Sequence, residues 1–208
     1  MASPRIIFAA LVGALIWGLS APCQSKPAAE STSATTGEQN PMTFSISSTD
    51  IRVAHRSIEV GAEYERFTAA LEKILGRFSR DVETDMAKDP KLAAERIKAM
   101  EGEQGLMIFL TLNHGAALAM AGGARRGKQY LIGNPLTAIQ MSRHDFRAAL
   151  YAPLRVLVYE KTKGRTTVEY DQPSTLFDQF GNPEVTEVGV SLDHKLENAL
   201  KRAAELSR

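Results

Sequence analysis

Cysteine is almost absent from this chain of 208 residues, in which Cys23 is the single example. One cysteine cannot form an intramolecular disulfide, and Cys23 also lies before the region that we expect to fold. This excludes a disulfide framework and catalysis by a cysteine nucleophile in the domain. Cysteine usage therefore permits export to an oxidising compartment without requiring it.

An excess of charge of one sign is also lacking. The chain has 25 Lys and Arg residues against 24 Asp and Glu residues, which gives a formal net charge of +1. Such a small charge produces no field strong enough to recruit nucleic acid non-specifically, so we expect no nucleic-acid partner. The hydrophobic fraction of 44% is ordinary for a globular protein, and with this length it indicates one domain with its own core.

The usual signatures of catalysis and nucleotide binding are missing. The chain has no G-x-S-x-G sequence of the kind that carries a serine nucleophile. The spacing of Gly122, Gly127 and Lys128 is close to the sequence pattern of a phosphate-binding loop, but Gln129 stands where that pattern requires Ser or Thr. The stretch also precedes an expected strand, whereas a phosphate-binding loop opens a helix. We therefore interpret it as a solvated basic turn.

No two of the four histidines are three or four residues apart, the spacing that lets one helix chelate a metal ion. The four are His55, His114, His144 and His194. His114 is the one most typical of a functional site, because it follows Asn113 at an expected strand end where a pocket rim forms easily. We expect no cofactor.

Hydrophobic runs long enough for a comfortable membrane span are lacking as well. The uncharged stretch from Ile6 to Leu19 follows Arg5 and is shorter than the roughly 20 residues of a spanning helix. This favours a signal peptide in residues 1–23. Cleavage after Ser20 or Cys23, lipidation of Cys23 and retention as an N-terminal anchor all stay open. We expect export to the periplasm or cell envelope, with membrane contact only through this segment.

Residues 24–41 contain no Val, Ile, Leu, Met or aromatic residue. Such a segment cannot bury enough apolar surface to offset its ordering entropy, so we expect a flexible spacer. The remaining residues, 42–208, form the expected domain.

Alternation and helical periodicity then give the elements of this domain. The charge-rich stretch 81–104 is interpreted as a surface insertion, in which Asp89 caps a helix that begins at Pro90 and runs through Met100. The expected strands are Ile51–Val60, Leu106–Leu112, Lys128–Ile132, Leu154–Glu160 and Arg165–Tyr170. The first expected helix begins near Ala62, and its apolar face consists of Phe67, Leu71, Ile74, Leu75 and Phe78. Four further helices are expected to begin after Asn113, at Pro135, at a capping box formed by Ser142 and Asp145, and after Ser191. This order predicts an α+β domain with one sheet and helices packed on one face.

Several of these segments together resemble the family called domain of unknown function 302. The resemblance covers roughly Ile51 to Arg208 and rests on Gly133-Asn134-Pro135, on Pro153–Glu160 followed by Gly164–Tyr170, and on Asn113-His114. It implies a TATA-binding-protein-like fold, in which a single curved, mostly antiparallel sheet is packed against helices. Domains of this family are often dimeric, so a homodimer is among the expected states. The resemblance implies no reaction and no DNA binding. The chain departs from the family pattern by Asn113 where Asp is usual and by the inserted helix.

We therefore expect an uncharacterised envelope domain that serves as a non-catalytic binding module for a small apolar ligand or a protein partner rather than as an enzyme. The candidate ligand-binding residues are His114, Asn134, Arg155 and Tyr170. One alternative is a hydrolase or isomerase that uses His114 with Glu169 or Asp171 of the hairpin, which requires these groups to converge. Another is metal or haem binding through His114 and His144, which requires the two imidazoles to lie on the same side of the domain.

Overall fold

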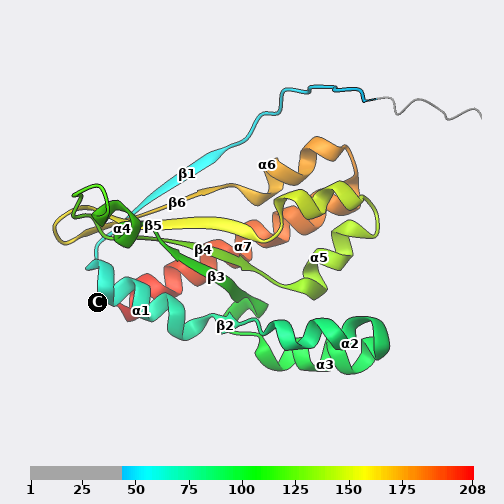
Figure 1. Cartoon of the computed structure of the whole chain (residues 1–208), viewed down its shortest axis with the longest axis horizontal. Coiled ribbons are helices and arrows are strands. Elements are labelled where there is room, and N and C mark those ends of the chain that lie inside the picture. The colour runs from blue at the N-terminus through cyan, green and yellow to red at the C-terminus, as the bar shows by residue number, and fades with distance from the viewer. Residues whose placement is uncertain (1–43) are drawn as a thin grey trace, which may run out of the picture. The chain divides into compact units, whose positions relative to one another are not determined.

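The computed structural model describes residues 44–208, and the chain from Ser48 onward forms one compact unit. The unit is built on a six-stranded sheet with the order β1-β6-β5-β4-β3-β2 (Figure 1). The strands are β1 (His55–Val60), β2 (Gly76–Arg77), β3 (Met107–Asn113), β4 (Gly127–Gly133), β5 (Leu154–Thr162) and β6 (Arg165–Asp171). Neighbouring strands are antiparallel except β2, which is parallel to β3. The predicted α+β class with a mostly antiparallel sheet is confirmed.

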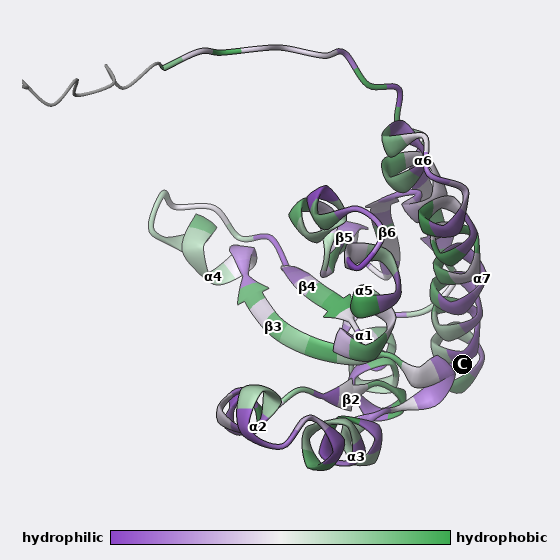
Figure 2. Ribbon diagram, turned by 90° about the vertical axis from the view of Figure 1, so that its right-hand side faces the viewer, coloured by the Kyte–Doolittle hydropathy of each residue, from purple (hydrophilic) through white to green (hydrophobic). Residues whose placement is uncertain are grey.

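The helices pack around this sheet, with α6 and α7 along one side of it (Figure 2). The α-helices are α1 (Tyr64–Ile74), α2 (Glu83–Lys88), α3 (Pro90–Met100), α4 (His114–Ala119), α5 (Pro135–Ser142), α6 (Pro173–Phe177) and α7 (Pro183–Leu206). Short 3₁₀ helices are η1 (Arg80–Val82), η2 (Glu103–Gly105), η3 (Phe146–Tyr151) and η4 (Asp178–Phe180). None of the helices in this part of the chain combines the length and hydrophobicity that crossing a bilayer requires.

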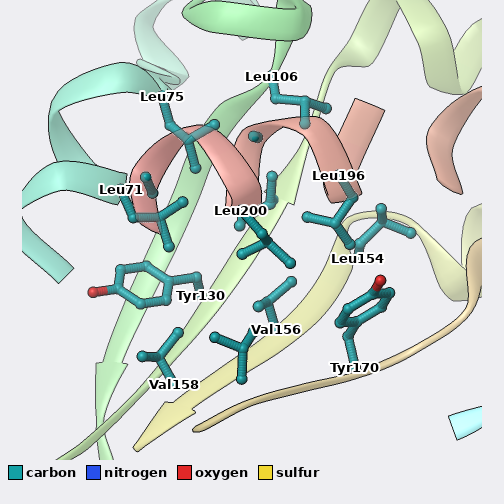
Figure 3. Close-up of a cluster of buried hydrophobic side chains, with 14 of the residues drawn as sticks. Leu71, Leu75, Leu106, Tyr130, Leu154, Val156, Val158, Tyr170, Leu196 and Leu200 are labelled. Carbon is teal, nitrogen blue, oxygen red and sulfur yellow. The ribbon is translucent and has the colours of Figure 1, made fainter. Parts of the chain in front are cut away.

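The main core lies between one face of the sheet and the helices α1 and α7. Alternate strand residues point to this face, because side chains along a strand alternate between its two sides. They meet Leu71 of α1 and Leu196 and Leu200 of α7 (Figure 3). The sheet residues of this core include Tyr130, Ile132, Leu154, Val156, Val158, Val168 and Tyr170. We call this the covered face and the other side the open face.

The insertion helices α2 and α3 build a second, smaller core at the β2 edge, where Val82, Ala93 and Ile97 surround Met107. The chain passes Gly76 as it enters β2 and passes Gly102 on its way from α3 to β3, and the two backbones touch there. A Cβ on Gly76 would lie 1.9 Å from the carbonyl oxygen of Met100 and 2.7 Å from the amide nitrogen of Gly102. Both glycine N–H groups donate to the Leu106 carbonyl oxygen, at 3.0 and 3.2 Å. No side chain fits at this crossing.

Four predicted boundaries were wrong, beginning with the first strand, which starts at His55 and not at Ile51. The helix expected to reach Phe78 ends at Ile74, because the crossing at Gly76 draws the chain into β2. The last helix begins at Pro183, nine residues before the expected start at Leu192, with the Asn182 side chain as its cap. Asp145, without Ser142, caps the turn that follows α5, since Ser142 is still within that helix.

Candidate functional site

An apolar pocket of about 540 Å³ lies at the end of β4, where the chain leaves the sheet for α5. This volume falls within the roughly 300–1,000 Å³ typical of small-molecule sites. The walls come from β3, β4, the start of β5, the helices α2, α5, α6 and α7, and the segment after β2. Apolar side chains lining it are Phe78, Met86, Phe109, Leu131, Ile132, Met141, Pro153, Leu154, Phe177 and Leu192. We refer to it below as the apolar pocket.

A bulge in β3 supplies the aromatic wall of the apolar pocket. The pairing of β3 with β4 shifts register between Ile108 and Leu110, so Phe109 is an extra residue in the ladder. The Phe109 ring stacks on Phe78, with 4.4 Å between the ring centroids and 25° between the ring planes. Phe78 follows β2, so this wall joins two segments about thirty residues apart in the chain.

The charged groups at the apolar pocket are paired with each other. Arg80 donates from Nε and Nη2 to the two carboxylate oxygens of Glu83, at 3.0 and 3.3 Å. This hydrogen bonding raises the pKa of the Arg80 guanidinium above its ordinary value. Both side chains are exposed, which places the pair at the mouth. The apolar pocket therefore offers a ligand no net charge.

Asn134 is the one sequence-predicted candidate that lines the apolar pocket. Its Oδ1 accepts a hydrogen bond from the Leu136 amide at 2.8 Å and so caps α5. Its Nδ2 donates to Glu101 Oε1 at 2.6 Å and to the Gly105 carbonyl at 2.8 Å. Both amide hydrogens are thus in use, and the side chain fixes the backbone at the pocket instead of presenting a donor to a ligand.

Arg155 and Tyr170, the next two candidates, lie on opposite faces of the sheet. Tyr170 pairs across the strands with Val156 and is buried in the main core (Figure 3). Burial also raises the pKa of its hydroxyl. Arg155 is on the open face, with Nη2 3.6 Å from Asp171 Oδ2. Both residues border a surface hollow of about 220 Å³, but their side chains point to opposite faces and do not form one site.

His114, the fourth candidate, begins α4 at the end of β3, and its Nε2 lies 3.4 Å from Oε1 of Gln129. The hairpin carboxylates contact a different histidine on the open face. His55 Nδ1 is 3.1 Å from Asp171 Oδ1, and its Nε2 is 3.6 Å from Glu169 Oε2. The hydrogen bond with Asp171 raises the pKa of His55, while partial desolvation opposes the rise. The structure therefore does not assemble the acid–base pair that the enzyme alternative needs.

The metal alternative required His114 and His144 to lie near each other. His144 follows α5, beyond one end of β4, whereas His114 lies at the opposite end of that strand. Nε2 of His144 accepts a hydrogen bond from Nε of Arg143 at 3.1 Å. Between residues 44 and 208, no group of three or more His, Cys, Asp or Glu side chains is placed to hold a metal ion.

A partly buried carboxylate joins α1 to the sheet. Glu72 Oε1 accepts hydrogen bonds from Lys128 Nζ and from the Tyr130 hydroxyl, both at 2.8 Å. Burial by itself would raise the pKa of Glu72, but the two hydrogen bonds outweigh burial and the pKa is lowered. Burial and the neighbouring carboxylate raise the pKa of Tyr130, so its hydroxyl stays protonated and donates. This arrangement is structural, because every polar group in it has a partner.

Sequence reasoning missed the residues that form the apolar pocket, above all Phe78, Phe109 and Met141. The helical pattern places Phe78 on the face that begins with Phe67, and the apolar run places Phe109 inside a regular strand. No local pattern marks the bulge or the stacking of the two rings, since both depend on how distant strands pair. Pro153, by contrast, belonged to the family resemblance and does line the pocket.

Comparison with known proteins agrees with this fold. Residues 82–203 match the family model described as Domain of unknown function DUF302. A crystal structure of an uncharacterized conserved protein DUF302 from Bacillus stearothermophilus is similar at a TM-score of 0.52 and 14% sequence identity. The alignment covers 72% of this chain and 97% of that one, and at this identity it shows the fold alone. No curated protein matches the chain.

Proposed function

Because this chain belongs to the family described as Domain of unknown function DUF302, whose description carries no reaction, we propose a function from the apolar pocket itself. The domain is a binding module for a small, uncharged, apolar molecule. The observation that carries this proposal is a pocket of about 540 Å³ whose interior is formed by aromatic, methionine and aliphatic side chains. Such concave, mostly apolar sites are where small molecules bind in proteins.

The polar groups around the apolar pocket support an uncharged ligand. Arg80 and Glu83 neutralise each other at the mouth, and Asn134 has used both of its amide hydrogens. Of the polar residues that line the pocket, Thr137 remains to orient a ligand group. A charged ligand would lose its hydration without gaining a partner, which is unfavourable.

Methionines in two walls favour a ligand of variable shape. Met86 comes from α2 and Met141 from α5, so they lie on separate elements. The methionine side chain is unbranched and polarisable, and it adapts to irregular apolar surfaces. We propose selection by size and apolarity in this pocket, with little selection by hydrogen bonding.

The place of action that we propose is the cell envelope. The support is the sequence from Ile6 to Leu19 behind Arg5, which is typical of an export signal and lies outside the described residues. A carrier of apolar molecules in an aqueous envelope compartment shields its ligand from water, which is the use that the apolar pocket fits.

The test is a titration of the full chain with the uncharged apolar fluorophore phenylnaphthylamine. Ala138 lines the pocket on α5, so Ala138→Phe fills it with a ring, whereas Ala138→Leu fills it in part. The matched control is Ala94→Phe, a half-buried helical alanine of α3 that does not line the pocket. Thermal unfolding of each variant checks that it is folded.

We expect saturable binding that Ala138→Phe weakens by at least about ten-fold, corresponding to a loss of roughly 1.4 kcal/mol. The affinity of the Ala138→Leu variant should lie between those of the unmodified chain and the Ala138→Phe variant, and the Ala94→Phe variant should bind the probe as the unmodified chain does. Anionic anilinonaphthalene sulfonate should bind more weakly than the uncharged probe. Equal binding by the Ala138→Phe and Ala94→Phe variants would refute the proposal, because the probe would then occupy another surface.

A further inference from the structure

The connection between β3 and β4 presents apolar side chains to solvent. No Asp, Glu, Lys or Arg occurs from Gln104 to Ala124, and the second half of this stretch forms α4 and the turn after it. Met120 at the turn is 91% exposed and Leu118 is 40% exposed. Figure 2 shows α4 and its turn projecting from the sheet as a pale green, apolar element. We call residues 114–124 the apolar tip.

The apolar tip has defined internal packing. Asn113 caps α4 by accepting a hydrogen bond from the Ala116 amide at 2.9 Å. A Cβ on Gly115 would lie 2.4 Å from the Arg125 carbonyl oxygen, so the returning chain packs directly on the helix. Gly123 likewise lies against the Leu118 side chain. Because these contacts hold the connection, Met120 is presented at a fixed place.

Cationic side chains lie at the same end of the sheet as the apolar tip. The strand register places the tip and the β5–β6 turn at the same end of the sheet, as Figure 1 also shows. Arg125 and Lys163, which lie at these two connections, make no ion pair with any described residue. The other basic side chains at this end, Arg126, Lys161 and Arg165, pair with Glu65, Glu160 and Glu59.

We propose that the apolar tip docks on the surface of an anionic lipid bilayer. Met120 and Leu118 enter the interfacial region, and Arg125 and Lys163 lie at the level of the anionic headgroups. Apolar side chains flanked by cations are the combination that holds a peripheral protein on such a surface. A projecting tip also suits a bilayer, which deforms around it, better than a partner that must supply a matching hollow.

The proposal adds a membrane contact to the one expected from the N-terminal segment. It is independent of the apolar pocket, because the tip and the pocket lie at opposite ends of β4. Docking through the tip would therefore leave the pocket mouth open.

The experiment places an environment-sensitive dye on the tip of the full chain. Met120→Cys in a Cys23→Ser background carries the dye, so the signal reports the tip and not insertion of the N-terminal segment. The matched control is Leu150→Cys in the same background. Like Met120, Leu150 is a highly exposed apolar residue, 78% accessible, but it belongs to η3 at the other end of the sheet. Vesicles contain phosphatidylglycerol and phosphatidylcholine in equal parts, or phosphatidylcholine alone.

With anionic vesicles, the dye at position 120 should shift to the blue and be quenched by brominated acyl chains, while the dye at 150 should not. Arg125→Gln with Lys163→Gln should weaken this response by about 25-fold, about five-fold for each cation. An absent shift at 120, an equal shift at 150, or an equal response to neutral vesicles would overturn the proposal. So would a shift at 120 that grows with protein concentration before vesicles are added, because a second copy would then cover the tip.

Discussion

The covered and open faces of the sheet use the same strands in different ways. Val156 points to the covered face and is completely buried, while its neighbour Leu157 points to the open face and is only partly buried. On the covered face, the helices α1 and α7 complete the packing, and Glu72 of α1 accepts hydrogen bonds from Lys128 and Tyr130 there. On the open face, charged side chains such as Asp171 and His55 pair at the surface. One face therefore determines the fold, and the other tolerates change.

The sharpest test of this comparison uses the two adjacent residues of β5. Val156→Asp should destabilise the domain by at least about 4 kcal/mol, because it buries a charge without a partner. Leu157→Asp should cost less than about 1 kcal/mol, since its carboxylate reaches water. Denaturant unfolding of both variants measures the difference. Similar losses would mean that the two faces are equally buried and would break the comparison.

A smaller difference is expected between two carboxylates. Glu72→Ala should cost about 2 kcal/mol, because it leaves Tyr130 and Lys128 without their acceptor in a partly buried place. Glu169→Ala on the open face should cost about 0.5 kcal/mol or less. Chemical unfolding at neutral pH provides the values.

The same pair of variants gives a pH test. The folded-state pKa of Glu72 is lowered, so its stabilisation is present above the unfolded pKa and is lost as the pH falls through the folded value. Glu72→Ala should therefore lose less stability on acidification than the unmodified chain. If the free energy of unfolding fell equally steeply with acidification in both proteins, the Glu72 hydrogen bonds would not contribute as described.

The two ends of β4 extend the comparison to helix caps. Asn134→Ala should cost about 1–2 kcal/mol, because it removes the cap of α5 and two further hydrogen bonds. Asn113→Ala should cost about 0.5 kcal/mol, since α4 is short and exposed. Hydrogen exchange would localise each effect, with faster exchange at the pocket for the first and only at the apolar tip for the second.

The smallest expected effect concerns His55. Its pKa is raised in the folded state, so its contribution is complete below the unfolded value near 6.5 and disappears as the pH rises through the folded value. Because the side chain is largely exposed, the change should be well under about 0.5 kcal/mol. Melting curves of His55→Gln and the unmodified chain between pH 5 and 9 should converge at the alkaline end.

The sequence was sufficient for elements whose pattern is local. The Val- and Leu-rich run in Leu154–Glu160 before the turn at Gly164 and the Asn134-Pro135 pair predicted β5 and the start of α5 correctly. The first part of α7 was missed because it contains β-branched residues and Gly189, which have low helix propensity. There the helix is stabilised by packing: a Cβ on Gly189 would lie 3.0 Å from the Ser174 Cα, so glycine allows a close approach to α6 that a larger residue would meet only with a small shift of α6.

The site was less predictable than the fold. Arg155 and Tyr170 occur in the correct strands, but strand register decides which face each side chain meets, and register is a property of pairing between segments. The apolar pocket likewise depends on the Phe109 bulge and on Phe78, which reaches it only because the chain crosses itself at Gly76. Asn134 was found because the turn signal of asparagine before proline is local.

The crossing at Gly76 and Gly102 has a consequence for how such domains diversify. The excursion carrying α2 and α3 begins and ends at one point, so it could be exchanged for a longer, shorter or different segment while the six-stranded sheet keeps its register. Phe78 and Met86 of this excursion line the apolar pocket. A replaceable part thus meets the six-stranded sheet at the proposed binding surface, and ligand preference could be changed by grafting a different segment without redesign of the sheet.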